Sequence, residues 1–103
     1  MQYQLTLQFR GDAFDSYDAM IALEEDLIAA LVDSAEVDGH DVGSDETNIF
    51  VVTSDPAAAF AVAKPVLQLA GLLDTVTAAY REINGERYVV IWPEQWSGLF
   101  RVA

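Results

Sequence analysis

The chain opens with the stretch QYQLTLQFR (residues 2–10), in which polar and apolar side chains alternate without a break. This period of two is typical of a β-strand that buries one face and leaves the other face polar. Gly11 and Asp12 then end the pattern. The stretch therefore predicts a first strand whose apolar residues line one face of a sheet: Tyr3, Leu5, Leu7 and Phe9.

The next segment, residues 16–32, carries apolar residues at helical spacing and follows Asp15, which we expect to be the N-cap. One residue interrupts its apolar stripe, because Glu24 lies on the same side of the helix as Met20. A buried carboxylate is costly unless it is hydrogen-bonded or paired. Two interpretations stay open: an internal acid that lines a pocket and faces His40 or an arginine, and a structural acid that is bonded to backbone or tyrosine or lies at the rim of the core.

The middle of the chain predicts two strands and a second helix. Residues 37–53 have strand composition on both sides of a glycine-containing turn. Asp55-Pro56 is an N-cap followed by proline at the first helical position, and the helix that starts there is expected to end at Gly71. Pro65 removes one backbone hydrogen bond of this helix, so we expect a kink or a break at that point.

The end of the chain predicts a β-hairpin. Residues 75–83 and 86–92 have strand composition, and they flank Asn84-Gly85, the pair that most favours a two-residue turn. A two-residue turn fixes the register of the two strands. The expected pairs are Glu82 with Arg87, Tyr80 with Val89 and Ala78 with Ile91.

The predicted order is strand, helix, strand, strand, helix, strand, with an extra strand from the terminal hairpin. This is the order of a ferredoxin-like α+β sandwich, in which two helices cover one face of an antiparallel sheet. Another α+β sandwich with the same elements connected differently is the alternative. No linker and no internal repeat divides the sequence, so we expect a single domain over residues 1–103.

The charge of the chain is strongly acidic and unevenly placed. Seventeen acidic and five basic residues give a net charge of −12. Nucleic-acid binders and polybasic membrane binders need clustered Lys and Arg, so this charge argues against both classes. Residues 1–55 hold 13 acids and one base, whereas residues 56–103 hold four of each. The asymmetry indicates either an acidic face offered to a basic partner or a solvated surface that keeps the protein in solution.

Several kinds of chemistry lack the residues they require. The absence of cysteine excludes disulfides, thiolate zinc sites and cysteine nucleophiles. No phosphate-binding glycine loop, dinucleotide motif or serine nucleophile elbow occurs, so we expect no cofactor. The first residues lack the pattern of a signal peptide, and no apolar stretch has the length of a membrane span. We therefore expect a cytoplasmic protein with no membrane partner.

The most distinctive segment is VDGHDVGSDETNIF (residues 37–50), which holds the only histidine of the chain among four carboxylates. A histidine beside carboxylates serves in proton shuttles and in sites for hard metals. In a regular strand, however, Asp38 shares a face with His40 while Asp41 points to the opposite face. The spacing of a calcium loop is not met either, so we expect no metal site. The candidate interaction residues of the segment are Asp38, His40, Asp41, Asp45 and Glu46.

The predicted hairpin places Tyr88 and Trp92 on the sheet face that points away from the helices, beside the polar residues of the first strand. Tyrosine, tryptophan and arginine are enriched at the centres of protein interfaces. This open face therefore predicts a homodimer contact or a ligand surface. The alternative is that the C-terminal segment covers Trp92 and Trp96.

Three segments together carry a resemblance to known sequences: VDGHDVGSDETNIF (37–50), KPVLQLAGLLD (64–74) and YREINGERYVVIWPE (80–94). The chain resembles a set of small, acidic, uncharacterised bacterial proteins with a VDGHDxGSxxxNIF-type segment and a WPE-type ending. The resemblance implies a ferredoxin-like fold and a cytoplasmic bacterial protein. It carries over no catalytic residue.

These patterns favour a non-enzymatic, acidic protein-interaction domain, of the immunity or inhibitor type, whose acids cover a basic partner. The alternative is a small-ligand-binding or regulatory module with a pocket between helix and sheet that contains Glu24, His40 or Tyr80. A third hypothesis is an enzyme that uses His40 and its neighbouring carboxylates. Loss of a detected activity in a folded His40→Ala variant would support that third hypothesis.

Overall fold

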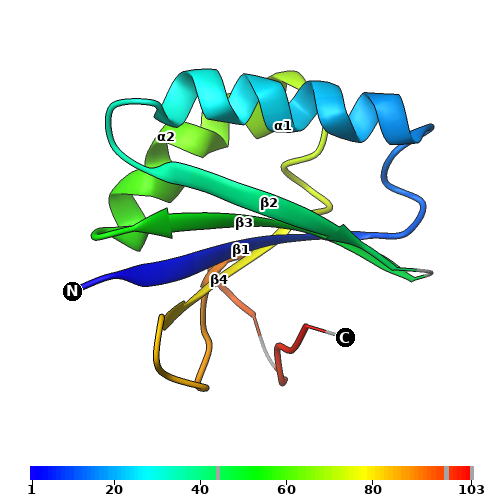
Figure 1. The fold of residues 1–103 in the computed structure, drawn as a ribbon. Coiled ribbons are helices and arrows are strands. Elements are labelled where there is room, and N and C mark those ends of the chain that lie inside the picture. Colours follow the sequence, from blue (N-terminus) through cyan, green and yellow to red (C-terminus); the bar gives the residue numbers. More distant parts are fainter. Residues whose placement is uncertain (44, 97, 103) are drawn as a thin grey trace.

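The computed structural model describes residues 1–43, 45–96 and 98–102. Both helices lie on one side of a sheet, and the C-terminal segment (residues 93–96 and 98–102) lies on the other side (Figure 1). The elements and their bounds are β1 Tyr3–Arg10, α1 Tyr17–Leu31, β2 Glu36–Val42, β3 Glu46–Thr53, α2 Pro56–Leu69, β4 Thr77–Glu82 and β5 Val89–Trp92.

The five strands form one sheet in the order β2-β3-β1-β4-β5, and each neighbouring pair is antiparallel. This confirms the prediction of an α+β architecture with an antiparallel sheet. The strand with the clearest alternation in the sequence, β1, has two neighbours and lies in the middle. β2 and β5 form the two edges.

The core lies between β1 and the helices. Leu5, Leu7 and Phe9 are fully buried, as the alternation in β1 predicts, and Leu7 pairs with Ile49 of β3 on the same face. Each buried leucine or phenylalanine contributes about 1.5–3 kcal/mol through removal of apolar surface from water. The helices supply the other wall of the core with Leu23, Leu27, Leu31, Phe60, Ala63 and Leu67.

The N-cap of α1 is Ser16 rather than Asp15. Ser16 has an extended backbone, and its Oγ accepts a hydrogen bond from the backbone N–H of Ala19 at 3.1 Å. The prediction that Asp15 caps the helix is therefore wrong. Aspartate and serine cap helices about equally well, so the sequence alone could not decide between the two adjacent residues.

α2 starts as predicted and passes through Pro65 without a break. The carboxylate of Asp55 accepts a hydrogen bond from the backbone N–H of Ala58 at 3.1 Å, and proline follows as the first helical residue. Of the predicted kink or break at Pro65, the break does not occur, because the helix continues to Leu69. Proline removes one backbone bond, but Ala63 and Leu67 on either side are fully buried, and their packing holds both turns against the core.

Gly71 ends α2 as predicted. Its φ of +74° lies in the left-handed region, where glycine has no Cβ penalty. The N–H of Gly71 donates to the carbonyl of Gln68 at 3.0 Å, and the N–H of Leu72 donates to the carbonyl of Leu67 at 2.9 Å. These two bonds form a Schellman motif, which satisfies carbonyls that the helix end leaves free.

The terminal hairpin forms, but part of its register differs from the prediction. Tyr80 lies opposite Val89, as expected. Ala78, however, lies opposite Trp92 rather than Ile91, because the register shifts between Ala78 and the next residue of β4. The shift inserts one extra residue into β5, which is a β-bulge.

The turn of the hairpin is also longer than predicted. β4 ends at Glu82 and β5 begins only at Val89, so Glu82 and Arg87 do not form the predicted strand pair. Instead, Nη1 of Arg81 donates to three backbone carbonyls, those of Glu82 at 3.1 Å, Ile83 at 2.7 Å and Gly85 at 3.2 Å. This guanidinium organises a wider loop than the two residues that Asn-Gly pairs favour.

The C-terminal segment lies across the sheet face that points away from the helices (Figure 1). Phe100 is only 9% exposed. The backbone carbonyl of Arg101 accepts a hydrogen bond from Nε2 of Gln8 in β1 at 3.0 Å. Thr6 points to the same face and is fully buried. The face that the sequence predicts to be open is therefore partly closed by the chain itself.

Candidate functional site

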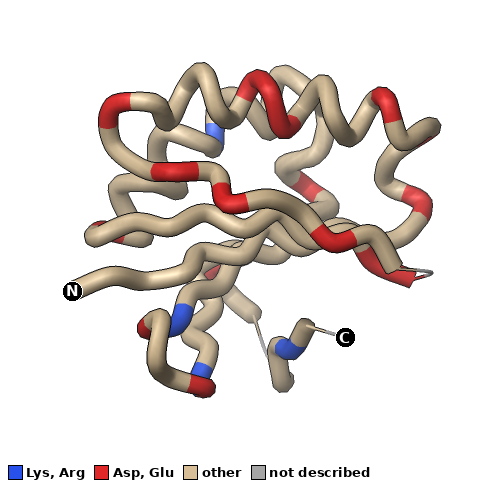
Figure 2. The backbone as a smooth tube through the Cα atoms, viewed as in Figure 1, with Lys and Arg blue, Asp and Glu red and all other residues tan. Residues whose placement is uncertain are grey.

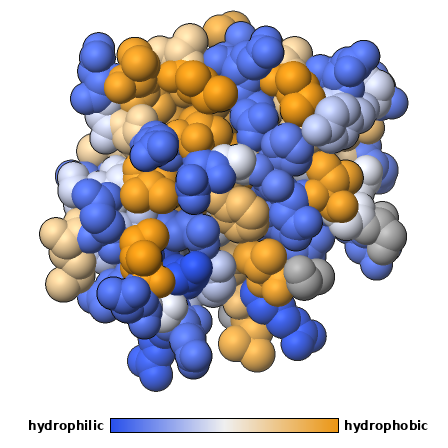
Figure 3. Space-filling view, viewed as in Figure 1, coloured by the Kyte–Doolittle hydropathy of each residue, from blue (hydrophilic) through white to orange (hydrophobic). Residues whose placement is uncertain are grey.

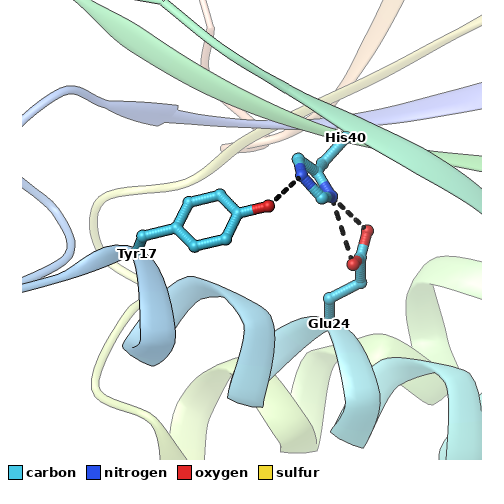
Figure 4. A network of polar contacts seen from close by, with 3 residues as sticks. All are labelled: Tyr17, Glu24 and His40. Carbon is cyan, nitrogen blue, oxygen red and sulfur yellow. Dashed lines mark hydrogen bonds and ion pairs between the residues drawn. The ribbon is translucent and has the colours of Figure 1, made fainter.

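Glu24 lies on the side of α1 that faces β2. The residues of α1 that point into the core are Met20, Leu23, Leu27 and Leu31. Glu24 borders this stripe, and its side chain is only 12% exposed. Tyr17 precedes it by seven residues, about two helical turns, so both side chains emerge on the same side of α1 (Figure 4).

His40 reaches α1 because β2 contains a β-bulge. Val37 lies opposite Val51 and His40 lies opposite Ile49. Between these two pairs β2 advances by three residues while β3 advances by two. Gly39 lies within the bulge and has a φ of +112°, a conformation that side chains rarely adopt. The extra residue turns His40 to the same side as Val37, toward the helices.

Tyr17, His40 and Glu24 form one chain of polar contacts (Figure 4). The two carboxylate oxygens of Glu24 lie 3.1 and 3.0 Å from Nδ1 of His40. The Oη of Tyr17 lies 3.1 Å from Nε2 of the same ring, and the two rings meet edge to face with their centroids 5.8 Å apart. The His40 side chain is 23% exposed and Tyr17 is 58% exposed. Glu24 faces His40, as the first interpretation expected, but it also borders the core, as the second expected. It lines neither of the two hollows described below.

The hydrogen-bond donors and acceptors of the Tyr17, His40 and Glu24 side chains can be matched one to one. An ionised carboxylate only accepts hydrogen bonds, and a neutral imidazole donates from one nitrogen and accepts at the other. With Nδ1 of His40 donating to Glu24, Nε2 accepts from the hydroxyl of Tyr17. The carboxylate thereby sets the tautomer and the orientation of the ring. The contact of Tyr17 with His40 was not expected from the sequence. The available signal was the spacing of seven residues between Tyr17 and Glu24, which places both side chains on the same side of a helix.

A hollow of about 190 Å³ opens beside Tyr17. Its walls come from the loop after β1, the first turn of α1 and the adjoining ends of β2 and β3. Ligand pockets for drug-sized molecules measure about 300–1,000 Å³, so this hollow suits only a small group. The residues that line it are Gly11, Phe14, Ser16, Met20, Val42 and Thr47, together with Tyr17.

The exposed acids of the distinctive segment lie along one edge of the sheet. Asp38 and Asp41 lie on β2, and Asp45 lies in the turn to β3. The prediction that Asp38 shares a face with His40 is wrong, because the bulge breaks the alternation between them. Together with Glu36, which is also exposed on β2, these three residues form a surface that we call the acidic edge.

The acidic edge belongs to a larger separation of charge. Figure 2 shows acidic residues without basic ones on α1, on β2 and in the turns beside them, whereas the β4–β5 loop carries both acidic and basic residues. Figure 3 shows that hydrophilic side chains dominate the same view and that apolar side chains interrupt them only in small groups. Charge, rather than apolar area, is therefore the main property of this side of the molecule.

Glu46 differs from the other predicted acids because it has hydrogen-bond donors from the protein. Its Oε2 accepts from Nδ2 of Asn48 at 2.8 Å and from Nε2 of Gln8 at 3.2 Å. Gln8 also donates to Oδ1 of Asn48 at 3.1 Å, and Asn48 is fully buried. These bonds tie β1 to β3, so we leave Glu46 out of the acidic edge.

Tyr88 and Trp92 lie on different sides of the sheet, and the prediction that they share a face is wrong. Tyr88 packs edge-on against Phe100 of the C-terminal segment, with ring centroids 4.9 Å apart. Trp92 instead contacts α2: its ring lies 5.9 Å from that of Phe60, and Nζ of Lys64 lies 4.4 Å from its centroid. The bulge in β5 explains the difference, because one extra residue turns Trp92 to the helix side.

A larger groove of about 560 Å³ separates the C-terminal segment from the loop before β5. The side chains along it include Glu86, Arg87, Tyr88, Glu94, Trp96 and Phe100. Carboxylates and a guanidinium line the same groove, so its chemistry does not favour one charge of ligand.

Neither helix within the described ranges combines the length and the apolar character that crossing a membrane requires. Among the residues that the structure describes, no three His, Cys, Asp or Glu side chains are grouped so as to hold a metal ion. Comparison with protein families, with curated proteins and with solved structures finds no match.

Proposed function

We propose that this chain is a non-enzymatic interaction domain that binds a basic protein through its acidic edge, in the manner of an immunity or inhibitor protein. The observation that supports the proposal is the separation of charge in space. The four carboxylates of the acidic edge are exposed on one border of the sheet, whereas acidic and basic residues occur together around the opposite border and balance one another there (Figure 2). A basic partner would approach one side of the molecule in preference to the other.

The fold that presents this edge is, in our assignment, ferredoxin-like. The strand order β2-β3-β1-β4 and the placement of both helices on one face support this assignment. β5 then extends the sheet beyond β4, on the border away from the acidic edge. Such an arrangement leaves β2 free for a partner.

Recognition at the acidic edge is expected to depend on side-chain charge rather than on added strand pairing. An exposed edge strand can pair with a strand of another chain, but charged side chains and bulges oppose such pairing. β2 has both features, with its bulge between Val37 and His40 and its exposed carboxylates. Complementary charge speeds association up to about 100-fold or more at low salt, and this effect weakens as salt screens it.

The test compares two variants that carry the same charge. The edge variant replaces Glu36, Asp38, Asp41 and Asp45 by the corresponding amides, and the control variant does the same to Asp74, Glu82, Glu86 and Glu94. All eight residues are exposed, and both net charges change from −12 to −12 + 4 = −8. Each protein is used to capture partners from the lysate of the source cells at low and at high salt.

We expect one basic protein to bind the wild type and the control variant at low salt, and to be lost with the edge variant and at high salt. Association with the purified partner should then be about 100-fold slower for the edge variant. Equal binding by the two variants, or capture of no partner, would contradict the proposal.

A further inference from the structure

The Tyr17–His40–Glu24 chain goes beyond the proposed function, because nothing in partner binding at the acidic edge requires it. A phenol, an imidazole and a carboxylate lie in line, with 3.1 Å between Oη and Nε2 and 3.0 Å between Nδ1 and the nearer carboxylate oxygen. A nucleophile within hydrogen-bond reach of a base, with the base oriented by a third group, is the arrangement that activates hydroxyl nucleophiles. Here the hydroxyl belongs to Tyr17.

The two partners of Tyr17 are held firmly, while the phenol itself is accessible. Glu24 is 12% exposed, and it contacts the imidazole with both carboxylate oxygens. His40 is fixed by its place beside the bulge of an edge strand that is paired to β3. Tyr17, at 58% exposed, is open to a small molecule from solution.

The surroundings of Tyr17 select the kind of molecule that can react with it. The adjoining hollow of about 190 Å³ is lined in large part by apolar side chains, those of Phe14, Met20 and Val42. Exposed carboxylates flank Tyr17 in the sequence at Asp15 and Asp18, in a chain with a net charge of −12. This negative charge disfavours anionic donors such as phosphate esters, and the hollow beside Tyr17 has room for a small uncharged acyl group.

We propose that Tyr17 is a site of covalent acylation by small, uncharged aryl esters, with His40 as its base and Glu24 as a positioning residue. In this step Oη of Tyr17 forms a bond to the carbonyl carbon of the ester, and the bond between that carbon and the aryl oxygen breaks. The proton of Tyr17 passes to Nε2 of His40 and then to the departing aryl oxygen. The products are the acyl-tyrosine and the free phenol, so no further reactant is needed.

The reaction is tested with p-nitrophenyl acetate and the full chain. Mass spectrometry of peptides gives the rate of acetylation at each of the four tyrosines, and N-acetyltyrosinamide serves as the fully exposed reference. We expect Tyr17 to react about 100-fold faster than the reference, which is the lower end of what a positioned base contributes. We expect His40→Ala to remove this advantage.

The role of Glu24 needs a measurement that a purely structural role would not change. Glu24→Gln should slow the acetylation of Tyr17 and also change the ratio of the two His40 tautomers in ¹⁵N NMR spectra, because an amide can also present a donor to Nδ1. The matched control is Glu25→Gln, whose exposed side chain lies one position along α1. It should alter neither quantity.

Two outcomes would overturn the proposal. One is that Tyr17 of the wild-type chain reacts no faster than N-acetyltyrosinamide, a result that stands even if a variant does not fold. The other is that a folded His40→Ala variant is acetylated at Tyr17 as fast as the wild type. Neither measurement involves a protein partner, so failure here is distinct from failure at the acidic edge.

Discussion

At the scale of single residues, two buried threonines on neighbouring strands differ in whether their hydroxyls are paired. Thr6 in β1 is fully buried, and its Oγ1 has no hydrogen-bond partner within the part of the chain that the structure describes. Thr53 in β3 is 3% exposed, and its Oγ1 accepts from the N–H of Asp55 at 3.0 Å and donates to the carbonyl of Asp55 at 3.2 Å. The same substitution is therefore expected to act in opposite directions at the two sites.

We predict that Thr6→Val raises the free energy of unfolding by about 1 kcal/mol, because valine has nearly the same shape and removes an unpaired buried hydroxyl. Thr53→Val is predicted to lower it by about 1–2 kcal/mol, because two backbone groups of Asp55 lose their partner. Urea unfolding followed by circular dichroism measures both values. A loss of stability in Thr6→Val equal to that in Thr53→Val would show that the Thr6 hydroxyl is satisfied in solution.

The residues of the candidate site differ in how far the sequence could reveal them. Glu24 could be singled out, because a carboxylate inside an apolar stripe is a visible conflict between pattern and burial. The contact between Glu24 and His40 was part of one of two open interpretations, since two residues that are 16 positions apart, one on a helix and one on a strand, can lie in many relative positions. Tyr17 was assigned no role from the sequence. The hydroxyl of Tyr17 matters because it contacts His40 on another element, and no local sequence pattern indicates that contact.

At the scale of elements, two bulges explain the wrong predictions about which side chains share a face of the sheet. Period-two alternation assumes that each residue reverses the direction of the side chain. One extra residue in β2 turned His40 toward α1, and one extra residue in β5 turned Trp92 toward α2. A bulge depends on how two paired strands and the elements packed on them fit together, so the sequence of one strand does not specify it. Gly39 was the one local hint, because glycine inside a strand often marks a bulge.

We predict that Gly39→Ala lowers the free energy of unfolding by about 1–3 kcal/mol, because its φ of +112° is strained for any residue with a Cβ. No atom lies within 4 Å of the added Cβ, so backbone strain is the whole effect. Gly43→Ala is the matched control in the same segment, where the added Cβ meets Glu46 at an ordinary 3.5 Å, and its effect should stay within about 0.5 kcal/mol. Equal effects in urea unfolding would argue against a strained bulge at Gly39.

At the scale of the whole molecule, the order of elements was predictable and the path of the C-terminal segment was not. Each helix and strand carries its own periodicity or cap, so the α+β architecture followed from local patterns. The sequence of residues 93–102 has neither helical nor strand periodicity, and the positions of Phe100 and Arg101 depend on partners elsewhere in the chain, Tyr88 and Gln8. Their cover over the sheet bears directly on the homodimer hypothesis, because a second copy would need this segment to move first.

Two adjacent residues of the C-terminal segment test its position, because Phe100 is 9% exposed and Leu99 is 88% exposed. We predict that Phe100→Ala lowers the free energy of unfolding by about 3 kcal/mol, as expected for loss of a buried phenylalanine. Leu99→Ala should stay within about 0.5 kcal/mol of the wild type.

Sedimentation velocity of the same proteins should show a monomeric wild type, with any self-association through the sheet face stronger in Phe100→Ala than in Leu99→Ala. Equal losses of stability in the two variants would mean that this segment does not pack on the sheet, and a dimeric wild type would mean that the covered face is not what keeps two copies apart.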